Sequence, residues 1–214
     1  MNKVTNSVFC VFLSLFIIGV SILLTVSFKE LYYFDINHLD IAINNNLSVN
    51  EVKQNYDYMI DYNLGKISGN FNLPTIKSSL EGKIHFQEVK DIVQNVLKVL
   101  LVSFVISLVG IYISIKNKNI NFLNTTSNLV LILPIVVLIP IAINFDKAFI
   151  LFHEIMFDND YWIFDPEKDP IINLLPQEFF FHASLMIIGL ILLSSLFLKL
   201  LYKYLESKKI CIQH

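Results

Sequence analysis

Two histidines stand in polar segments beside apolar runs, where a titratable side chain is unusual. His153 lies in FHEIMFDNDYW, after one apolar run, and His85 lies in GKIHFQEVKDI, before another. An imidazole exchanges a proton near neutral pH and is the usual general base of enzymes. If the two rings meet, they form a pair that can move a proton between reacting groups. If they do not, each is an interfacial aromatic ring with a polar tip.

Acidic and aromatic residues accompany both histidines. Glu88 follows His85 by one helical turn, where a carboxylate could orient the imidazole and raise its basicity. Asp160 and Asp165 flank Trp162, the only tryptophan. One interpretation is an interfacial belt with solvated carboxylates. The other is that Trp162 forms the floor of a lipid-facing pocket, whose carboxylates bind a cationic group or the histidines.

A metal centre is the first alternative chemistry. His153 and Glu154 begin the zinc motif HExxH, but Phe157 occupies the position of the second histidine. A metal-dependent hydrolase built from His85, His153 and a distant carboxylate stays open. The two cysteines lie near opposite ends of the sequence, so no thiolate cluster is expected. We expect no metal and no cofactor.

Serine catalysis and nucleotide or nucleic-acid binding also lack support. No glycine-rich phosphate loop is present, and the lysine-rich side of the protein has no arginine and few aromatic residues, so nucleic-acid binding has no support. Three serines lie on the same predicted side of the membrane as the histidines, but no nucleophile elbow surrounds Ser78, Ser79 or Ser184.

The composition is that of an integral membrane protein, because 55% of the 214 residues are hydrophobic and 16% are charged. Four apolar runs can be helices that cross a bilayer, which takes roughly 20 residues. The predicted order is a signal-anchor span (1–28), an extracytoplasmic subdomain (29–91), a second span (92–115), a cytoplasmic loop (116–128), a third span (129–152), an extracytoplasmic loop (153–178), a fourth span (179–202) and a cytoplasmic tail (203–214).

Lysine determines the predicted orientation in the plasma membrane. With four spans, both termini and the loop 116–128 share one side, where Glu206 is the only acidic residue. The positive-inside rule makes that side cytoplasmic, and the histidines then face the extracytoplasmic side. The excess of carboxylates on the outer side is common in membrane proteins, but it could also attract a protonated amine. The cytoplasmic lysines are Lys3, Lys116, Lys118, Lys199, Lys203, Lys208 and Lys209.

The segment 29–91 is predicted to be a small mixed subdomain. Ser48 and Glu51 match a capping box, and helical spacing of apolar residues continues from Val49 to about Tyr62. The stretches LYYFDINHLDIAI and KISGNFNL mix aromatic, β-branched and turn-forming residues, which favours short strands. The predicted fold is an all-α transmembrane protein, a four-helix membrane bundle with this mixed extracytoplasmic subdomain.

Two span helices are predicted to extend beyond the membrane and to carry the histidines. A helical period through 89–97 places His85 in or just before the first turn of the second span helix. The third span helix is predicted to overrun its exit, with Phe149 and His153 on one face. Proline-containing turns then predict a lid or a re-entrant floor before Pro176 begins the fourth span helix.

These features together resemble the lipoprotein intramolecular transacylase (Lit) family of low-GC Gram-positive bacteria, over essentially the whole chain. The resemblance rests on the four spans, on Tyr56, Met59 and Tyr62, and on the segments HFQEVKD and FHEIMFDNDYWIFDPEKDPIINLLPQEFF. His85 matches the histidine of the family's HFxEVK-like segment, and His153 matches that of its FHxxxF segment. The resemblance implies that these two are catalytic. We expect support or substrate binding from Tyr62, Glu88, Asp160, Trp162 and Asp165.

The resemblance also implies an activity and its partners. Family members act on lipoproteins whose N-terminal cysteine carries an S-diacylglyceryl group, and move the sn-2 acyl chain to the α-amine of that cysteine. Diacylated lipoproteins and membrane lipids are the implied partners. Imidazoles could catalyse such an aminolysis without a covalent acyl-enzyme. The alternatives are a lipoprotein-binding envelope sensor, a hydrolase and an intermolecular N-acyltransferase.

Overall fold

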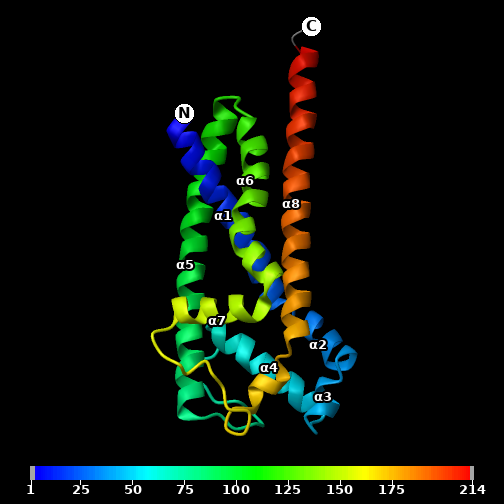
Figure 1. Cartoon of the computed structure of the whole chain (residues 1–214). Coiled ribbons are helices and arrows are strands. Elements are labelled where there is room, and N and C mark those ends of the chain that lie inside the picture. The colour runs from blue at the N-terminus through cyan, green and yellow to red at the C-terminus, as the bar shows by residue number, and fades with distance from the viewer. Residues whose placement is uncertain (1–2, 213–214) are drawn as a thin grey trace. The chain divides into compact units, whose positions relative to one another are not determined.

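The computed structural model describes residues 3–212, except for the side chains of residues 3, 136–138, 140–142, 145 and 209–212. This described part contains helices and no strand (Figure 1). It divides into two compact units. The first, here called the span unit, comprises Met1–Leu23, Lys98–Asn144 and Met186–His214. The second, here called the histidine unit, comprises Leu24–Leu97 and Phe145–Leu185.

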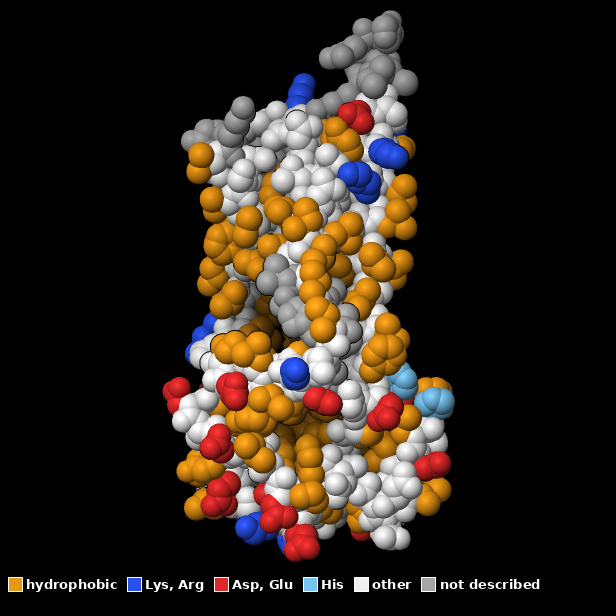
Figure 2. Space-filling model, viewed as in Figure 1, with side chains coloured by type: hydrophobic (Ala, Val, Ile, Leu, Met, Phe, Trp, Pro, Cys, Tyr) orange, Lys and Arg blue, Asp and Glu red, His pale blue; other side chains and the backbone are white. Residues whose placement is uncertain are grey.

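Three helices of the described residues are long and apolar enough to cross a membrane: α1 (Lys3–Ser27), α5 (Leu80–Lys116) and α8 (Gln177–Ile212). In the span unit these helices expose large apolar side chains, among them Leu192 and Leu196 of α8. Figure 2 shows hydrophobic side chains over the surface of this unit. Such exposure is unfavourable in water and favourable in lipid.

Charged residues separate two parts of α5. They are frequent in its first three turns, whereas residues 92–115 contain only Lys98. The apolar part therefore begins after His85, which lies outside the apolar run. The prediction that this helix begins ahead of its apolar run is confirmed, since α5 starts at Leu80.

The predicted third span does not form one continuous helix through 129–152. Helix α6 (Asn121–Ile143) ends before Asn144, and a separate helix, α7 (Phe145–Met156), carries His153. Asp146 lies in the first turn of α7, where a carboxylate stabilises a helix start through the helix dipole. The predicted overrun is therefore wrong, since the histidine is on a new helix. Part of the predicted span lies outside the described side chains.

The predicted short strands in the 29–91 segment are also wrong. LYYFDINH forms helix α2 (Lys29–His38), and α3 (Ile41–Asn44) follows it. The buried residues of α2 are Tyr32, Asp35 and Ile36, which have helical spacing. An aspartate at a buried position concealed that period in the sequence. KISGNFNL is irregular, although Phe71 within it is buried.

Helix α4 (Val49–Asn63) confirms the predicted helix to within one residue at its end. Its capping box has both reciprocal bonds: the Glu51 N–H donates to Ser48 Oγ, and the Ser48 N–H donates to Glu51 Oε2. The buried face of α4 packs in the core of the histidine unit. There the rings of Tyr32 and Tyr56 stack with centroids 3.7 Å apart, and Phe179 of α8 meets Tyr32 edge-on.

Candidate active site

The structure brings His85 of α5 and His153 of α7 together within the histidine unit. Their ring centroids are 6.1 Å apart, and the ring planes are inclined by 31°. Both side chains are buried, with 5% of His85 and 9% of His153 exposed. Two imidazoles at this separation can act on one bound molecule, although they do not hydrogen bond to each other.

Aromatic rings surround the histidine pair. The ring of Phe157 contacts both histidines, with centroids 4.7 Å from His85 and 5.6 Å from His153. Phe164 meets His85 edge-on at 5.3 Å, and the Trp162 ring lies 4.8 Å from that of His153. These rings give the two imidazoles apolar walls. Trp162 is therefore adjacent to a histidine, as the interpretation of Trp162 as a pocket floor required.

A hydrogen bond within α7 orients the His153 ring. Its Nδ1 lies 2.7 Å from the carbonyl oxygen of Phe149, one helical turn earlier. A carbonyl can only accept, so Nδ1 carries the hydrogen and the neutral ring has its lone pair on Nε2. The structure thereby leaves His153 with one nitrogen that can accept a proton.

Burial keeps both imidazoles neutral at physiological pH. Loss of hydration, and then the neighbouring His153, lower the pKa of His85 to about 4. Burial also lowers the pKa of His153, although its bond to the Phe149 carbonyl opposes the shift. Each ring can thus begin a reaction as a base, and a second proton on the pair is unfavourable.

Glu88 lies one turn after His85, but its hydrogen-bond partner is not the imidazole that we expected. Its Oε1 accepts a hydrogen bond of 2.8 Å from the side-chain amide of Asn159, in the loop after α7. No bond joins it to an imidazole. The other oxygen, Oε2, is buried without a hydrogen-bond partner among the described residues, and the same is true of Nδ1 of His85.

Tyr62 does not contact either histidine ring; it supports the helix that carries His85. Its hydroxyl donates to Oε1 of Gln87, and its ring lies under the Lys90 ammonium, 4.1 Å from Nζ. Both partners belong to α5, two and five residues after His85. The ring of Tyr62 also meets Phe71 edge-on at 5.1 Å. Tyr62 therefore fixes the start of α5 from the side of α4.

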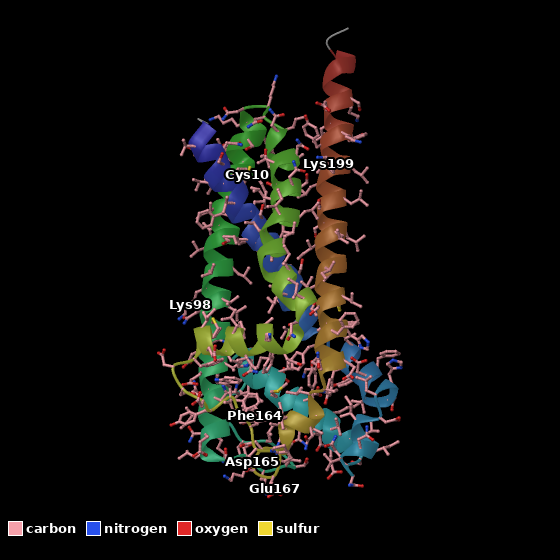
Figure 3. The ribbon with its side chains drawn as sticks, viewed as in Figure 1. Cys10, Lys98, Phe164, Asp165, Glu167 and Lys199 are labelled. Carbon is pink, nitrogen blue, oxygen red and sulfur yellow. The ribbon has the colours of Figure 1, made fainter. Side chains whose placement is uncertain are left out.

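Asp160 and Asp165 line a cavity of about 130 Å³ rather than contacting the histidines. Phe164, labelled with Asp165 in Figure 3, contributes both to this cavity and to the wall beside His85. Asp165 mainly stabilises its own turn, because Oδ1 accepts the Glu167 N–H and the backbone carbonyl accepts two further N–H groups. The sequence therefore located these carboxylates near the site but not at it.

Several residues of the site carried no recognisable signal in the sequence. Asn159 meets Glu88 across 71 positions of the chain, and the aromatic contacts of Phe164 are equally non-local. A separate pair, His182 and Asp35, lies 2.7 Å apart between α8 and α2. Within residues 3–212 no group of three or more His, Cys, Asp or Glu side chains could hold a metal ion.

Comparison with known proteins identifies the fold and the family. The family model for the lipoprotein intramolecular transacylase Lit matches residues 7–180. Three solved structures of the membrane-integral lipoprotein intramolecular transacylase Lit from Bacillus cereus are similar. The first is 41% identical, with 98% of this chain and 97% of that chain covered and a TM-score of 0.92.

The other two structures are of the Bacillus cereus protein with its His85 replaced by Arg or by Ala. Each is 40% identical to this chain, of which 98% is covered, with a TM-score of 0.90; the share of the other chain covered is 93% and 95%, respectively. A comparison with curated protein sequences found no match. The long family match and the near-complete structural match agree with the multi-pass apolar helices. The chain belongs to the lipoprotein intramolecular transacylase (Lit) family and is a membrane-integral acyltransferase.

Proposed function

We propose that this protein moves the sn-2 acyl chain of a lipoprotein's S-diacylglyceryl group to the α-amine of the same lipoprotein's N-terminal cysteine. The observation that carries the proposal is the buried pair of neutral imidazoles, His85 and His153, with ring centroids 6.1 Å apart. Membership of a family of intramolecular lipoprotein transacylases supports it. The product is a lyso-form lipoprotein.

The reaction requires proton transfers that two imidazoles can perform. The amine nitrogen attacks the ester carbonyl carbon, a C–N bond forms, and the bond from that carbon to the glyceryl oxygen breaks. In our proposal Nε2 of His153 accepts a proton from the attacking nitrogen and returns it to the departing oxygen. His85 is the second proton acceptor. Because the acyl group passes directly to the amine, no covalent acyl-enzyme forms.

Positioning supplies a second contribution to the proposed catalysis. Donor ester and acceptor amine belong to one substrate molecule, so the site must fold the lipid head until the two meet. The rings of Phe157, Phe164 and Trp162 provide apolar walls for this purpose. Tyr62 acts indirectly, by fixing Gln87 and Lys90 of the histidine helix. Asp160 and Asp165 act at the neighbouring cavity.

We further propose that the site faces the extracytoplasmic side, with both termini in the cytoplasm. The distribution of lysines supports this orientation through the positive-inside rule. The segments 29–91 and 153–178 are then extracytoplasmic, where mature lipoproteins reside. Diacylated lipoproteins and the surrounding membrane lipids are the proposed partners.

Mass spectrometry of the N-terminal lipopeptide of one lipoprotein tests the proposal. Cells that lack the gene would express the wild-type protein, His85→Ala, His153→Ala or the control His38→Ala, whose histidine is exposed on α2. We expect lyso-form lipopeptide with the wild type and the control. Each of the other two variants should lose about 10²- to 10⁴-fold in rate, as when a general acid or base is removed.

The products separate this function from its rivals. Free fatty acid would indicate a hydrolase, and a triacylated lipopeptide with consumption of phospholipid would indicate an intermolecular acyltransferase. An unmodified diacyl lipopeptide in every strain would favour a sensor. If His85→Ala and His153→Ala both retain lyso-form production, the proposed histidine mechanism is wrong.

A further inference from the structure

Two buried polar atoms of the site lack partners, and they lie on the same face of α5. Nδ1 of His85 and Oε2 of Glu88 have no hydrogen-bond partner among the described residues. Residues three apart on a helix are neighbours on its surface. Buried polar atoms are almost always hydrogen-bonded, so two open ones one helical turn apart indicate a place where a polar ligand binds, either water or a substrate group.

The geometry around Glu88 leaves one oxygen available and fixes its position. Asn159 donates through its amide nitrogen to Oε1 of Glu88 at 2.8 Å. The amide oxygen of the same Asn159 accepts the N–H of Tyr161 at 3.0 Å, which sets the orientation of the amide. No lysine forms an ion pair with Glu88 in the described part of the chain. The carboxylate is thus held in place without a cation.

The two open atoms specify the chemistry of their ligand. A carboxylate oxygen only accepts hydrogen bonds, and a neutral imidazole can accept through Nδ1. A group with several N–H donors and a positive charge satisfies both atoms at once. We propose that Glu88 Oε2 and His85 Nδ1 form a binding subsite for a primary ammonium group, the α-ammonium of the substrate's N-terminal cysteine. This inference rests on the proposed function and names the residues that bind its acyl acceptor.

The subsite also completes the proton balance of the proposed reaction. An α-ammonium must lose two protons to become an amide nitrogen: one before attack and one during it. The first passes to Nδ1 of His85, which releases it to solvent before His153 accepts the second, so the pair holds one proton at a time. The second passes through His153 to the glyceryl oxygen. The Glu88 side chain lies one helical turn from His85 and offsets the positive charge as it moves from the ammonium to His85, whose pKa burial would otherwise keep low.

A binding measurement with three lipopeptides tests the subsite directly. The full-length His153→Ala variant in nanodiscs prevents turnover, and the diacylglyceryl lipopeptides carry a free, an N-acetylated or an N-trimethylated α-amine. We expect the free amine to bind about 10- to 100-fold more tightly than the N-acetyl peptide, as for a charge-assisted hydrogen bond. The trimethyl peptide retains the charge but has no N–H, so it should also bind less tightly than the free amine.

Variants at Glu88 connect the preference to this residue. Glu88→Gln, made in the same background, retains an oxygen for Asn159 but removes the charge, so the preference for the free amine should fall below about threefold. Glu30→Gln is the control, because it removes an exposed carboxylate from α2 that does not line the cavity of Asp160 and Asp165. That variant should keep the preference.

Two results would overturn the proposal: no preference for the free amine in the His153→Ala protein, or an undiminished preference in Glu88→Gln. The first would indicate that a water molecule fills the subsite. If Glu88→Gln does not fold, the binding of the three peptides to the His153→Ala protein alone decides whether the site prefers a free α-amine. If the wild type still produces lyso-form lipoprotein, only the ammonium subsite is refuted, since the product could form without it. If the wild type does not produce it, the proposed function itself is wrong.

Discussion

The buried pair of Asp35 and His182 allows a quantitative stability prediction. Asp35 of α2 is fully buried, and its Oδ1 lies 2.7 Å from Nδ1 of His182 on α8. Its other oxygen has no partner among the described residues. Substitution His182→Ala would leave a buried carboxylate without any partner. Loss of one member of a buried pair costs about 3–5 kcal/mol in free energy of unfolding.

The lower end of that range applies here, because 26% of the His182 side chain is exposed and water can partly replace it. For a chain of this size, about 3 kcal/mol corresponds to a fall of roughly 6–12 °C in the thermal unfolding midpoint. Trp162 fluorescence in detergent micelles would report the midpoint. The double variant Asp35→Asn/His182→Ala should recover most of the loss, since an amide is cheaper to bury than a carboxylate.

The control for this prediction is His38→Ala, which removes an exposed ring with its centroid 6.0 Å from that of His182. It should change the stability by about 0.5 kcal/mol or less. A fall below roughly 3 °C for His182→Ala, or an equal fall in the double variant, would refute the assignment of the pair as a buried electrostatic contact.

Two further predictions concern pH and packing. The lowered pKa values of His85 and His153 favour their neutral forms in the folded state, so the stability they contribute is fully present above about pH 6.5 and is lost as the pH falls toward about 4. The thermal unfolding midpoint should therefore fall as the pH is lowered across this range, and it should fall less in His85→Gln. An equal dependence on pH in both proteins would contradict the attribution to His85. A Cβ on Gly82 would lie 2.3 Å from Oδ1 of Asp169, so Gly82→Ala should cost about 1–3 kcal/mol. Gly189→Ala meets open space and serves as the neutral control; similar midpoints for both variants would show that the contact is not important.

The elements that the sequence predicted well depend on local signals. The capping box of Ser48 and Glu51 starts α4 because both partners lie within one helical turn. The early start of α5 followed from apolar residues at helical spacing. The approach of His85 and His153 could be anticipated because the start of the second predicted span helix and the end of the third lie on the same predicted side of the membrane, although α7 is a separate helix after Asn144.

What could not be predicted depends on contacts between distant segments. Asp35 resembled a surface residue, and the helical period of α2 becomes visible only when its buried pairing with His182 is known. Asn159 and Glu88 are also far apart in the sequence. A carboxylate near a histidine was expected to orient the imidazole, but Oε1 of Glu88 instead accepts a hydrogen bond from the amide of Asn159. Local spacing specifies which residues are near, and the fold decides which of them bond.

Burial of the histidine pair explains why the proposed reaction is an aminolysis rather than a hydrolysis. At most a tenth of either histidine residue is accessible to solvent, and the rings of Phe157, Phe164 and Trp162 lie around the pair. A water nucleophile would have to enter this apolar space without hydrogen-bond partners other than the imidazoles and Glu88. A substrate amine arrives with its own lipid chains, which the aromatic walls favour. The exclusion of water that lowers the histidine pKa values would thus also select the nucleophile.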